Sequence, residues 1–315
     1  MVRVQEVEPG WYAVDVEFQQ VPQVIASYIF VGREGATVVD TGPQTTLPTL
    51  LAALSELGIG ETHVRNLVLT HIHLDHAGAA GHLLERFPQA RVFVHPVGAP
   101  HLVDPSRLWA SATRIYGERM EQLWGEIRPC PADRVVVVDD NETIDLGGGR
   151  RLRALATPGH ASHHHAYLDT ASGSVFAGDV AGIRIGGQRF VFPPTPPPDI
   201  DLGQWRRSIE RLRQLRPARL YLGHFGAVDD PEWHFDDLLA RLFLWGGWIG
   251  AQLELGQEPA VIAERLRELT EAELDQLAGG AAPLPAYHWA SGSYRMTVDG
   301  YVRYFRSHRP FASGV

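Results

Sequence analysis

The chain has 315 residues, of which 44% are hydrophobic and 21% are charged. This composition is typical of a folded protein with a sizeable core. A formal net charge of −9 opposes binding to DNA or RNA, which depends on an excess of basic side chains. The sequence has neither an apolar run of membrane-spanning length nor the pattern of a secretory signal at its start. We therefore expect a soluble cytoplasmic protein without a nucleic-acid or membrane partner.

The cysteine and lysine content limits the chemistry of this chain. Cys130 is the only cysteine, so an intrachain disulfide and a thiolate-rich zinc site are both excluded. All 28 basic side chains are arginines, and no lysine can act as a base, a nucleophile or a phosphate clamp. A metal site in this chain would have to use histidine and carboxylate ligands.

The first third of the chain alternates strand-like and helix-like segments. Residues 11–18, 24–31 and 36–39 are rich in β-branched and aromatic residues, which predicts an antiparallel meander. Residues 45–57 carry apolar side chains at helical spacing, and residues 66–70 predict a short buried strand. That strand leads directly into the run His71-Ile72-His73-Leu74-Asp75-His76.

The remaining patterns repeat this plan and then become helical. A helix at 81–87, a strand at 90–95 and a helical stretch at 107–127 are followed by strands at 134–139, 151–157, 165–168 and 174–177, a helix at 202–215 and a strand at 219–222. Residues 192–199 contain too much proline for a helix or a central strand and predict a stiff loop. Helices are expected at 235–255, 259–277 and 293–306.

Two β-rich halves with helices outside them predict an α/β fold, a four-layer αββα sandwich over residues 1–230. The helical patterns that follow predict a C-terminal subdomain over residues 231–315 that packs on this core.

The run from His71 to His76 has the spacing of metal ligands. Alternation along a strand places His71 and His73 on one side, while Ile72 points into the core. Asp75 and His76 follow at a turn into a helix, where they can face a second metal. Isolated histidines are usually structural, but three histidines and an aspartate within six residues are not explained in that way. Imidazole and carboxylate bind Zn²⁺, Mn²⁺ and Fe, so the identity of the metal stays open.

The same run resembles the HxHxDH signature of the metallo-β-lactamase superfamily. Four further segments resemble the other motifs of that family in the expected order: Val38-Val39-Asp40-Thr41-Gly42, Thr157-Pro158-Gly159-His160, Phe176-Ala177-Gly178-Asp179 and Leu222-Gly223-His224. The resemblance covers about residues 10 to 226.

The resemblance implies a metallo-β-lactamase sandwich that holds two divalent metal ions, with Zn²⁺ favoured over Fe or Mn. The first metal would be bound by His71, His73 and His160, the second by Asp75, His76 and His224, and Asp179 would bridge them. These seven ligands leave room for a bridging hydroxide that attacks a carbonyl polarised by the second metal. Asp75 would also pass a proton to the leaving group.

Two further residues are expected to support the ligands through hydrogen bonds. Asp40 belongs to the first family motif, and the alternative is that it only caps the turn before residue 45. His164 falls where many relatives carry a second histidine, and we expect it behind the site. His163 stands where those relatives carry glycine, and its role is not predicted.

Members of this superfamily share a site and differ in substrate. The single cysteine disfavours the commoner class B β-lactamases, and Val180 to Arg184 lack the tyrosine of the quorum-quenching lactonases. The length leaves no room for the flavodoxin domain of diiron oxygen reductases. The closest resemblance is to glyoxalase II-like hydrolases, which predicts hydrolysis of an ester, a thioester or a lactone of a small-molecule substrate. Glutathione specificity is disfavoured because no lysine can hold its carboxylate.

Two other activities share this ligand set. A mononuclear non-haem iron dioxygenase acting on a persulfide would load iron on the side of His71, His160 and Asp179. A phosphodiesterase is disfavoured by the acidic net charge. A metal-binding module without enzymatic activity is the weakest interpretation.

Two clusters of aromatic residues lie outside these motifs. Phe190, Phe192 and Tyr221, together with Trp205, are candidates for an apolar substrate pocket beside the proline-rich loop. The run from Leu242 to Trp245 suits a core face, a lid or a homodimer contact.

Overall fold

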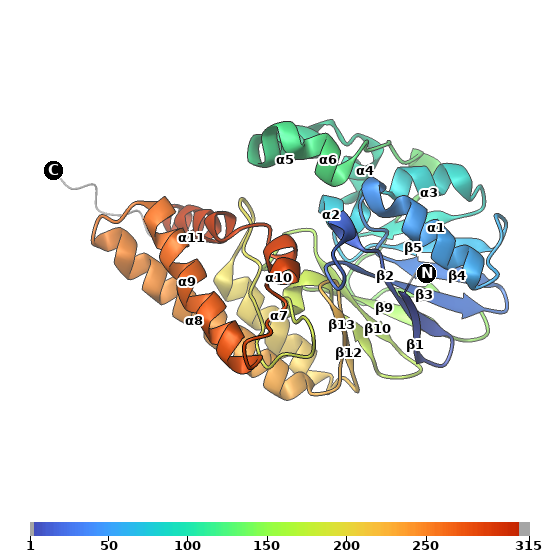
Figure 1. The fold of residues 1–315 in the computed structure, drawn as a ribbon. Helices are drawn as coiled ribbons and strands as arrows, with labels where there is room; N and C mark the ends of the chain where they lie inside the picture. The colour runs from blue at the N-terminus through green and yellow to red at the C-terminus, as the bar shows by residue number, and fades with distance from the viewer. Residues whose placement is uncertain (1–2, 309–315) are drawn as a thin grey trace.

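Two β-sheets lie face to face, and helices cover their outer faces (Figure 1). The computed structural model describes residues 3–308. Residues 1–2 and 309–315, which the predicted domain ranges include, lie outside the described residues. The prediction of an α/β four-layer αββα sandwich with a helical C-terminal region is confirmed. The boundary near residue 230 stays a prediction.

The first sheet has seven strands that follow one another in chain order. Strands β2 to β4 form the predicted antiparallel meander, β1 adds an antiparallel strand at its edge, and from β4 onward neighbouring strands are parallel. The strands are β1 (Arg3–Glu8), β2 (Trp11–Asp15), β3 (Ala26–Gly32), β4 (Gly35–Val39), β5 (Val64–Val68), β6 (Arg91–Val94) and β7 (Val135–Val137). Parallel neighbours need crossover connections, which explains the helices in this half.

The second sheet has six strands in the order β13-β12-β11-β10-β9-β8. All its neighbours are antiparallel except β11 and β12, which are parallel. The strands are β8 (Thr143–Asp145), β9 (Arg151–Ala156), β10 (His165–Asp169), β11 (Val175–Phe176), β12 (Leu220–Leu222) and β13 (Gly226–Val228). The edge strands β1, β8 and β13 are short or polar segments that the sequence patterns did not reveal.

Eleven α-helices and five 3₁₀ turns occur within residues 3–308. The helices are α1 (Leu47–Glu56), α2 (Leu74–Ala77), α3 (Ala80–Arg86), α4 (Ala99–Val103), α5 (Ser106–Tyr116), α6 (Met120–Trp124), α7 (Leu202–Gln214), α8 (Pro231–Glu254), α9 (Pro259–Leu277), α10 (Leu284–Ala290) and α11 (Tyr294–His308). The 3₁₀ turns are η1 (Phe18–Gln20), η2 (Gln44–Thr46), η3 (Gly117–Arg119), η4 (Ala132–Arg134) and η5 (Gly178–Ala181). None of the helices in this part of the chain combines the length and hydropathy of a membrane span.

The helical stretch predicted at 107–127 is broken into α5, η3 and α6. Gly117 has a φ of 55° and Gly125 a φ of 67°, and a right-handed helix cannot continue through such residues. The prediction of one helix was therefore wrong at these two glycines.

Aromatic side chains fill the space between the two sheets. Trp11 of β2 lies with its ring centroid 4.3 Å from that of Phe176 on β11, and Phe176 stacks on Tyr221 of β12 at 4.9 Å. The indole nitrogen of Trp11 donates a hydrogen bond to Asp169 on β10 at 2.8 Å. Large buried rings of this kind fix how two sheets pack.

The C-terminal helices lie beside α7 at one end of the sandwich (Figure 1). The face of α8 that points inward carries Phe235, Leu238, Leu242 and Ile249, which are all fully buried and lie at helical spacing. Leu244 of the same helix is 69% exposed. The run from Leu242 to Trp245 is therefore divided between core and surface.

Helix α11 contacts the proline-rich loop so closely that one position tolerates only glycine. A Cβ atom on Gly300 would lie 1.9 Å from the carbonyl oxygen of Thr195. We expect Gly300→Ala to lower the free energy of unfolding by about 1–3 kcal/mol, because the loop must move away. Urea denaturation measures this change.

The matched control is Gly247→Ala in helix α8. This glycine is exposed, and no atom lies within 4 Å of a Cβ built there. Alanine should stabilise the protein by up to about 1 kcal/mol, as is usual inside a helix. Equal effects at the two positions would contradict the close contact of α11 with the loop.

Candidate metal centre

Seven side chains with ligand atoms meet at one edge of the sandwich. They come from four segments: the loop after β5 with α2, the loop after β9, η5 after β11 and the loop after β12. Each segment follows directly on a strand, so the sheets fix where these side chains start. The residues are His71, His73, Asp75, His76, His160, Asp179 and His224.

Three imidazoles form the first ligand group. Nδ1 of His73 lies 3.0 Å from Nε2 of His71 and 3.1 Å from Nε2 of His160. Bonds from zinc to histidine are about 2.0–2.1 Å long, so nitrogens about 3 Å apart can share one cation. These three histidines are one of three groups among residues 3–308 that could hold a metal ion.

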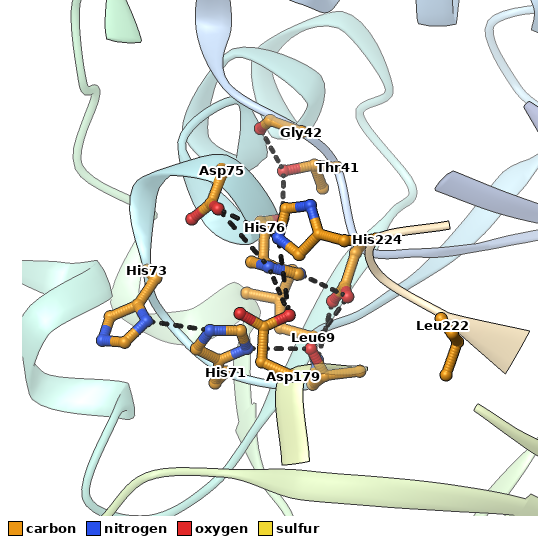
Figure 2. Close-up of polar contacts among 12 residues, drawn as sticks. Thr41, Gly42, Leu69, His71, His73, Asp75, His76, Asp179, Leu222 and His224 are labelled. Atoms are coloured by element: carbon orange, nitrogen blue, oxygen red, sulfur yellow. Dashed lines mark hydrogen bonds and ion pairs between the residues drawn. The ribbon is translucent and has the colours of Figure 1, made fainter. Parts of the chain in front are cut away.

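One carboxylate and two imidazoles form the second ligand group (Figure 2). Oδ2 of Asp75 lies 3.3 Å from Nε2 of His224 and 3.7 Å from Nε2 of His76. Asp75 and His76 are consecutive residues of helix α2.

Asp179 lies between the two groups. Its Oδ1 is 3.2 Å from Nε2 of His76 and 3.5 Å from Nε2 of His224. Its Oδ2 is 3.5 Å from Nε2 of His160. One oxygen of this carboxylate therefore faces each group, which is the arrangement that a bridging ligand needs.

Backbone carbonyls hold the second ring nitrogen of two of these histidines. Nδ1 of His160 donates to the carbonyl of Pro194 at 2.9 Å, and Nδ1 of His224 donates to the carbonyl of Val24 at 2.6 Å. Such bonds fix the tautomer that leaves Nε2 free as a ligand.

Asp40 holds both the metal loop and one ligand. Its Oδ1 accepts from the backbone N–H of Thr70, and its Oδ2 accepts from the hydroxyl of Thr70 and from Nδ1 of His76, all at 2.8 Å. Because the Thr70 hydroxyl donates to Asp40, it accepts from Nδ1 of His71 at 3.0 Å. The structure thus places Asp40 behind the ligands and not at the start of helix α1.

His164 also lies behind the candidate ligands. Nδ1 of His164 pairs with the hydroxyl of Thr157 at 2.8 Å, and its Nε2 accepts from the backbone N–H of Val180 at 3.4 Å. Val180 follows Asp179 in η5, so His164 fixes the turn that carries the shared carboxylate.

The first group of histidines is neutral at physiological pH. Burial lowers the pKa of His73 to about 4, and the neighbouring His160 adds to this shift. Burial, followed by the positive charge that His76 can carry, holds the pKa of His71 well below its usual value. A neutral imidazole is the form that binds a metal.

The second group pairs carboxylates with histidines. Burial by itself would raise the pKa of Asp179, but His76 and His224 outweigh it and hold this pKa well below its usual value. Burial would likewise raise the pKa of Asp75, but His76 and His224 lower it to about 2. Both carboxylates are therefore ionised and available as ligands.

Several of these ligand atoms lack a hydrogen-bond partner within residues 3–308. Nε2 of His76, Nε2 of His224 and Oδ1 of Asp179 are all buried in this state. Burying such atoms without a partner costs free energy, which a bound cation would offset. The donor set of imidazoles and carboxylates thus fits divalent transition metals.

His163, which the sequence left without a role, faces the site. The backbone N–H of Ile72 donates to its Nδ1 at 3.4 Å, and its ring centroid is 5.3 Å from that of His73. Burial lowers the pKa of His163 well below its usual value, so the ring is neutral and carries its proton on Nε2. Since His163 also lines the neighbouring cavity, it can offer a hydrogen-bond donor there.

A cavity of about 450 Å³ opens beside these residues. Its floor includes His73, Asp75, His160 and Asp179. Its walls come from α5 and α6 on one side and from the proline-rich loop, α10 and the start of α11 on the other. Sequence patterns gave no sign that these distant segments meet.

The substrate pocket expected at Phe190, Phe192 and Tyr221 requires correction, because none of them lines this cavity. Phe190 and Phe192 are fully buried against the C-terminal helices, where the ring centroid of Phe192 lies 4.9 Å from that of Trp245. Tyr221 belongs to the packing between the sheets described above. These aromatic residues are close to the ligands in sequence, but their side chains point into the core.

The sequence model described as the metallo-beta-lactamase superfamily matches residues 21–224. The chain belongs to this superfamily. The matched segment contains all seven candidate ligands together with Asp40 and His164.

Individual relatives extend this assignment. Over 237 residues the chain is 29% identical to the metallo-beta-lactamase fold-containing protein ST1585 of Sulfurisphaera tokodaii, covering 74% of this chain and 85% of that one. It is 31% identical over 208 residues to a hydroxyacylglutathione hydrolase of a Synechococcus species, covering 65% and 66%. The crystal structure of the metallo-beta-lactamase family protein TTHA1429 from Thermus thermophilus covers 96% of this chain and 95% of its own with a TM-score of 0.69 at 23% identity. That last likeness shows that the fold extends to the C-terminal helices.

Removal of the Asp40 carboxylate tests its role as a support. We expect Asp40→Ala to weaken metal binding by about 10- to 100-fold, because His76 loses the acceptor that orients its ring. Competition with a chelator measures this affinity. The control Asp133→Ala removes an exposed carboxylate in η4 and should leave it unchanged. An affinity in Asp40→Ala equal to that of the unmodified protein would contradict the assignment.

Proposed function

We propose that the protein is a dinuclear-metal hydrolase of the glyoxalase II-like branch, which cleaves an ester, a thioester or a lactone of a small molecule. The observation that carries this proposal is the position of Asp179, whose two oxygens face two separate groups of ligands. His71, His73 and His160 would hold one cation, and Asp75, His76 and His224 the other. Zn²⁺ suits this set best, while Fe and Mn remain compatible with it.

Two cations in such a site supply Lewis acidity and lower the pKa of a water molecule so that a nucleophile exists at neutral pH. The side chains of this protein provide the rest. Asp75 is ionised and lines the cavity, so it can accept a proton and pass it to the leaving group. His163 can donate a hydrogen bond from Nε2 to a carbonyl oxygen at the cavity wall.

Similarity to a hydroxyacylglutathione hydrolase supports acyl transfer to water. Glutathione itself is not part of the proposal, because this chain has no lysine to bind its carboxylate. The single Cys130 is 2% exposed within the core and does not line the cavity, which supports a site without thiolate.

Removal of individual ligands tests the proposed site. We expect Asp179→Ala and His71→Ala to reduce kcat/KM by about a thousandfold or more on any substrate, because each change removes a ligand. Thioesters, esters, lactones, β-lactams and phosphodiesters form the substrate panel.

Circular dichroism checks that these two variants remain folded. His63→Ala changes an exposed histidine and should keep full activity. Full activity in Asp179→Ala or His71→Ala would overturn the assignment, and turnover of phosphodiesters alone would replace it by a phosphodiesterase.

Metal content separates the hydrolase from a persulfide dioxygenase. We expect about two divalent ions per chain, mostly zinc, and no oxygen uptake with glutathione persulfide. Elemental analysis and an oxygen electrode measure these quantities. About one iron and no zinc per chain, together with oxygen uptake, would establish the dioxygenase instead.

A further inference from the structure

The cavity beside the candidate ligands has an aromatic end that the proposed reaction does not require. Phe18, Tyr116, Trp124 and Trp289 line it together with the metal-binding floor. They come from η1, α5, α6 and α10, so three distant parts of the sequence contribute to it.

The four rings form one connected cluster. Phe18 stacks on Trp124 with centroids 5.3 Å apart and an interplanar angle of 15°. Trp289 meets Phe18 edge-on at 5.8 Å, and Tyr116 meets Trp124 edge-on at 5.1 Å. A further ring can add to such a cluster through the same stacked and edge-on contacts.

The two walls of this end also touch each other. The hydroxyl of Tyr116 on α5 lies 3.9 Å from the sulfur of Met296 on α11. In Figure 1, α5 and α6 lie opposite α10 and α11 at the edge of the sandwich, and residues of all four helices line the cavity. Ile115, which is 42% exposed, extends the apolar wall along α5.

Charges at this end lie at its rim. Arg119 is exposed and places its guanidinium carbon 5.6 Å from the ring centroid of Trp289. Within residues 3–308 it has no ion pair, so no carboxylate competes for its place on the ring.

We propose that the aromatic end of the cavity binds an apolar ring carried by the substrate, next to the bond that is cleaved. This inference rests on the proposed hydrolase function and narrows its substrates to esters and thioesters with a benzyl-sized group. The ring can belong to the acyl part or to the leaving group, and both would use the same contacts. A cavity of about 450 Å³ accommodates such a group together with the reacting carbonyl.

Four thioesters test the inference: S-methyl phenylethanethioate, S-benzyl ethanethioate, S-methyl ethanethioate and S-methyl hexanethioate. They correspond to methyl phenylacetate, benzyl acetate, methyl acetate and methyl hexanoate with sulfur in place of the alkoxy oxygen. We expect at least one of the two ring-bearing compounds to exceed the methyl acetate analogue in kcat/KM by about tenfold or more. The compound that does so shows which part of the substrate occupies the aromatic end. Equal values for all four would overturn the proposal, as would a preference for the hexanoyl compound over both ring compounds.

Trp289 provides the matched variants, because it is only half-buried and lies next to the last residue of the short helix α10. Trp289→Ala should remove most of the preference for a ring, whereas Trp289→Phe should keep it within about twofold. Ile115→Ala should weaken the preference by about two- to fivefold without endangering the fold, because this side chain is partly exposed. Leu244→Ala, at an exposed position on α8, should leave it unchanged. An unaltered preference in both Trp289→Ala and Ile115→Ala would overturn the assignment of this end.

Calorimetry separates a failure of this inference from a failure of the proposed function. Phenylacetate should bind the purified protein about tenfold more tightly than acetate, and Trp289→Ala should abolish the difference. Binding of this kind without hydrolysis of any ester would support the ring site and overturn the hydrolase. Hydrolysis of all four thioesters with equal kcat/KM, together with equal affinity for the two acids, would support the hydrolase and overturn the ring site.

Discussion

The structure depends on the crowding of five imidazoles and two carboxylates in one buried space. Ligand atoms about 3 Å apart leave no room for water between them, and three other ligand atoms are buried without a hydrogen-bond partner among the described residues. Such an arrangement is costly unless a positive charge joins it. Hydrogen bonds to Nδ1 orient three of the imidazoles. Asp40 accepts from His76, and the carbonyls of Pro194 and Val24 accept from His160 and His224.

The two sheets supply the rigidity that this crowding requires. Each ligand segment follows a strand, and the aromatic packing of Trp11, Phe176 and Tyr221 keeps the sheets at a fixed separation. The loops that carry the ligands are short, so a small shift of a strand would displace the ligand atoms that follow it. The packing between the sheets therefore also determines the positions of the candidate ligands.

The ligand cluster could be predicted from the sequence because its members form local motifs. His71 to His76 lie within one short run, and His160, Asp179 and His224 each end a short segment that resembles a motif of the superfamily. The pocket could not be predicted in this way. Phe18, Trp124 and Trp289 are separated by more than a hundred residues from one another, and only tertiary packing brings them together. Phe190 and Phe192 were misleading because nearness in sequence does not fix the direction of a side chain.

The proline-rich loop connects the shape of the cavity wall to the position of one candidate ligand, His160. Its Pro194 carbonyl accepts a hydrogen bond from His160, while the neighbouring Thr195 hydroxyl donates to the Thr297 carbonyl on α11. A wall of the cavity and a ligand of the candidate centre therefore share one short span of backbone. Divergence of the C-terminal helices in this family would be restricted at this contact, since a sequence that reshapes the wall also displaces an imidazole. New specificity is easier to evolve from α5 and α6, which have no such attachment to His160.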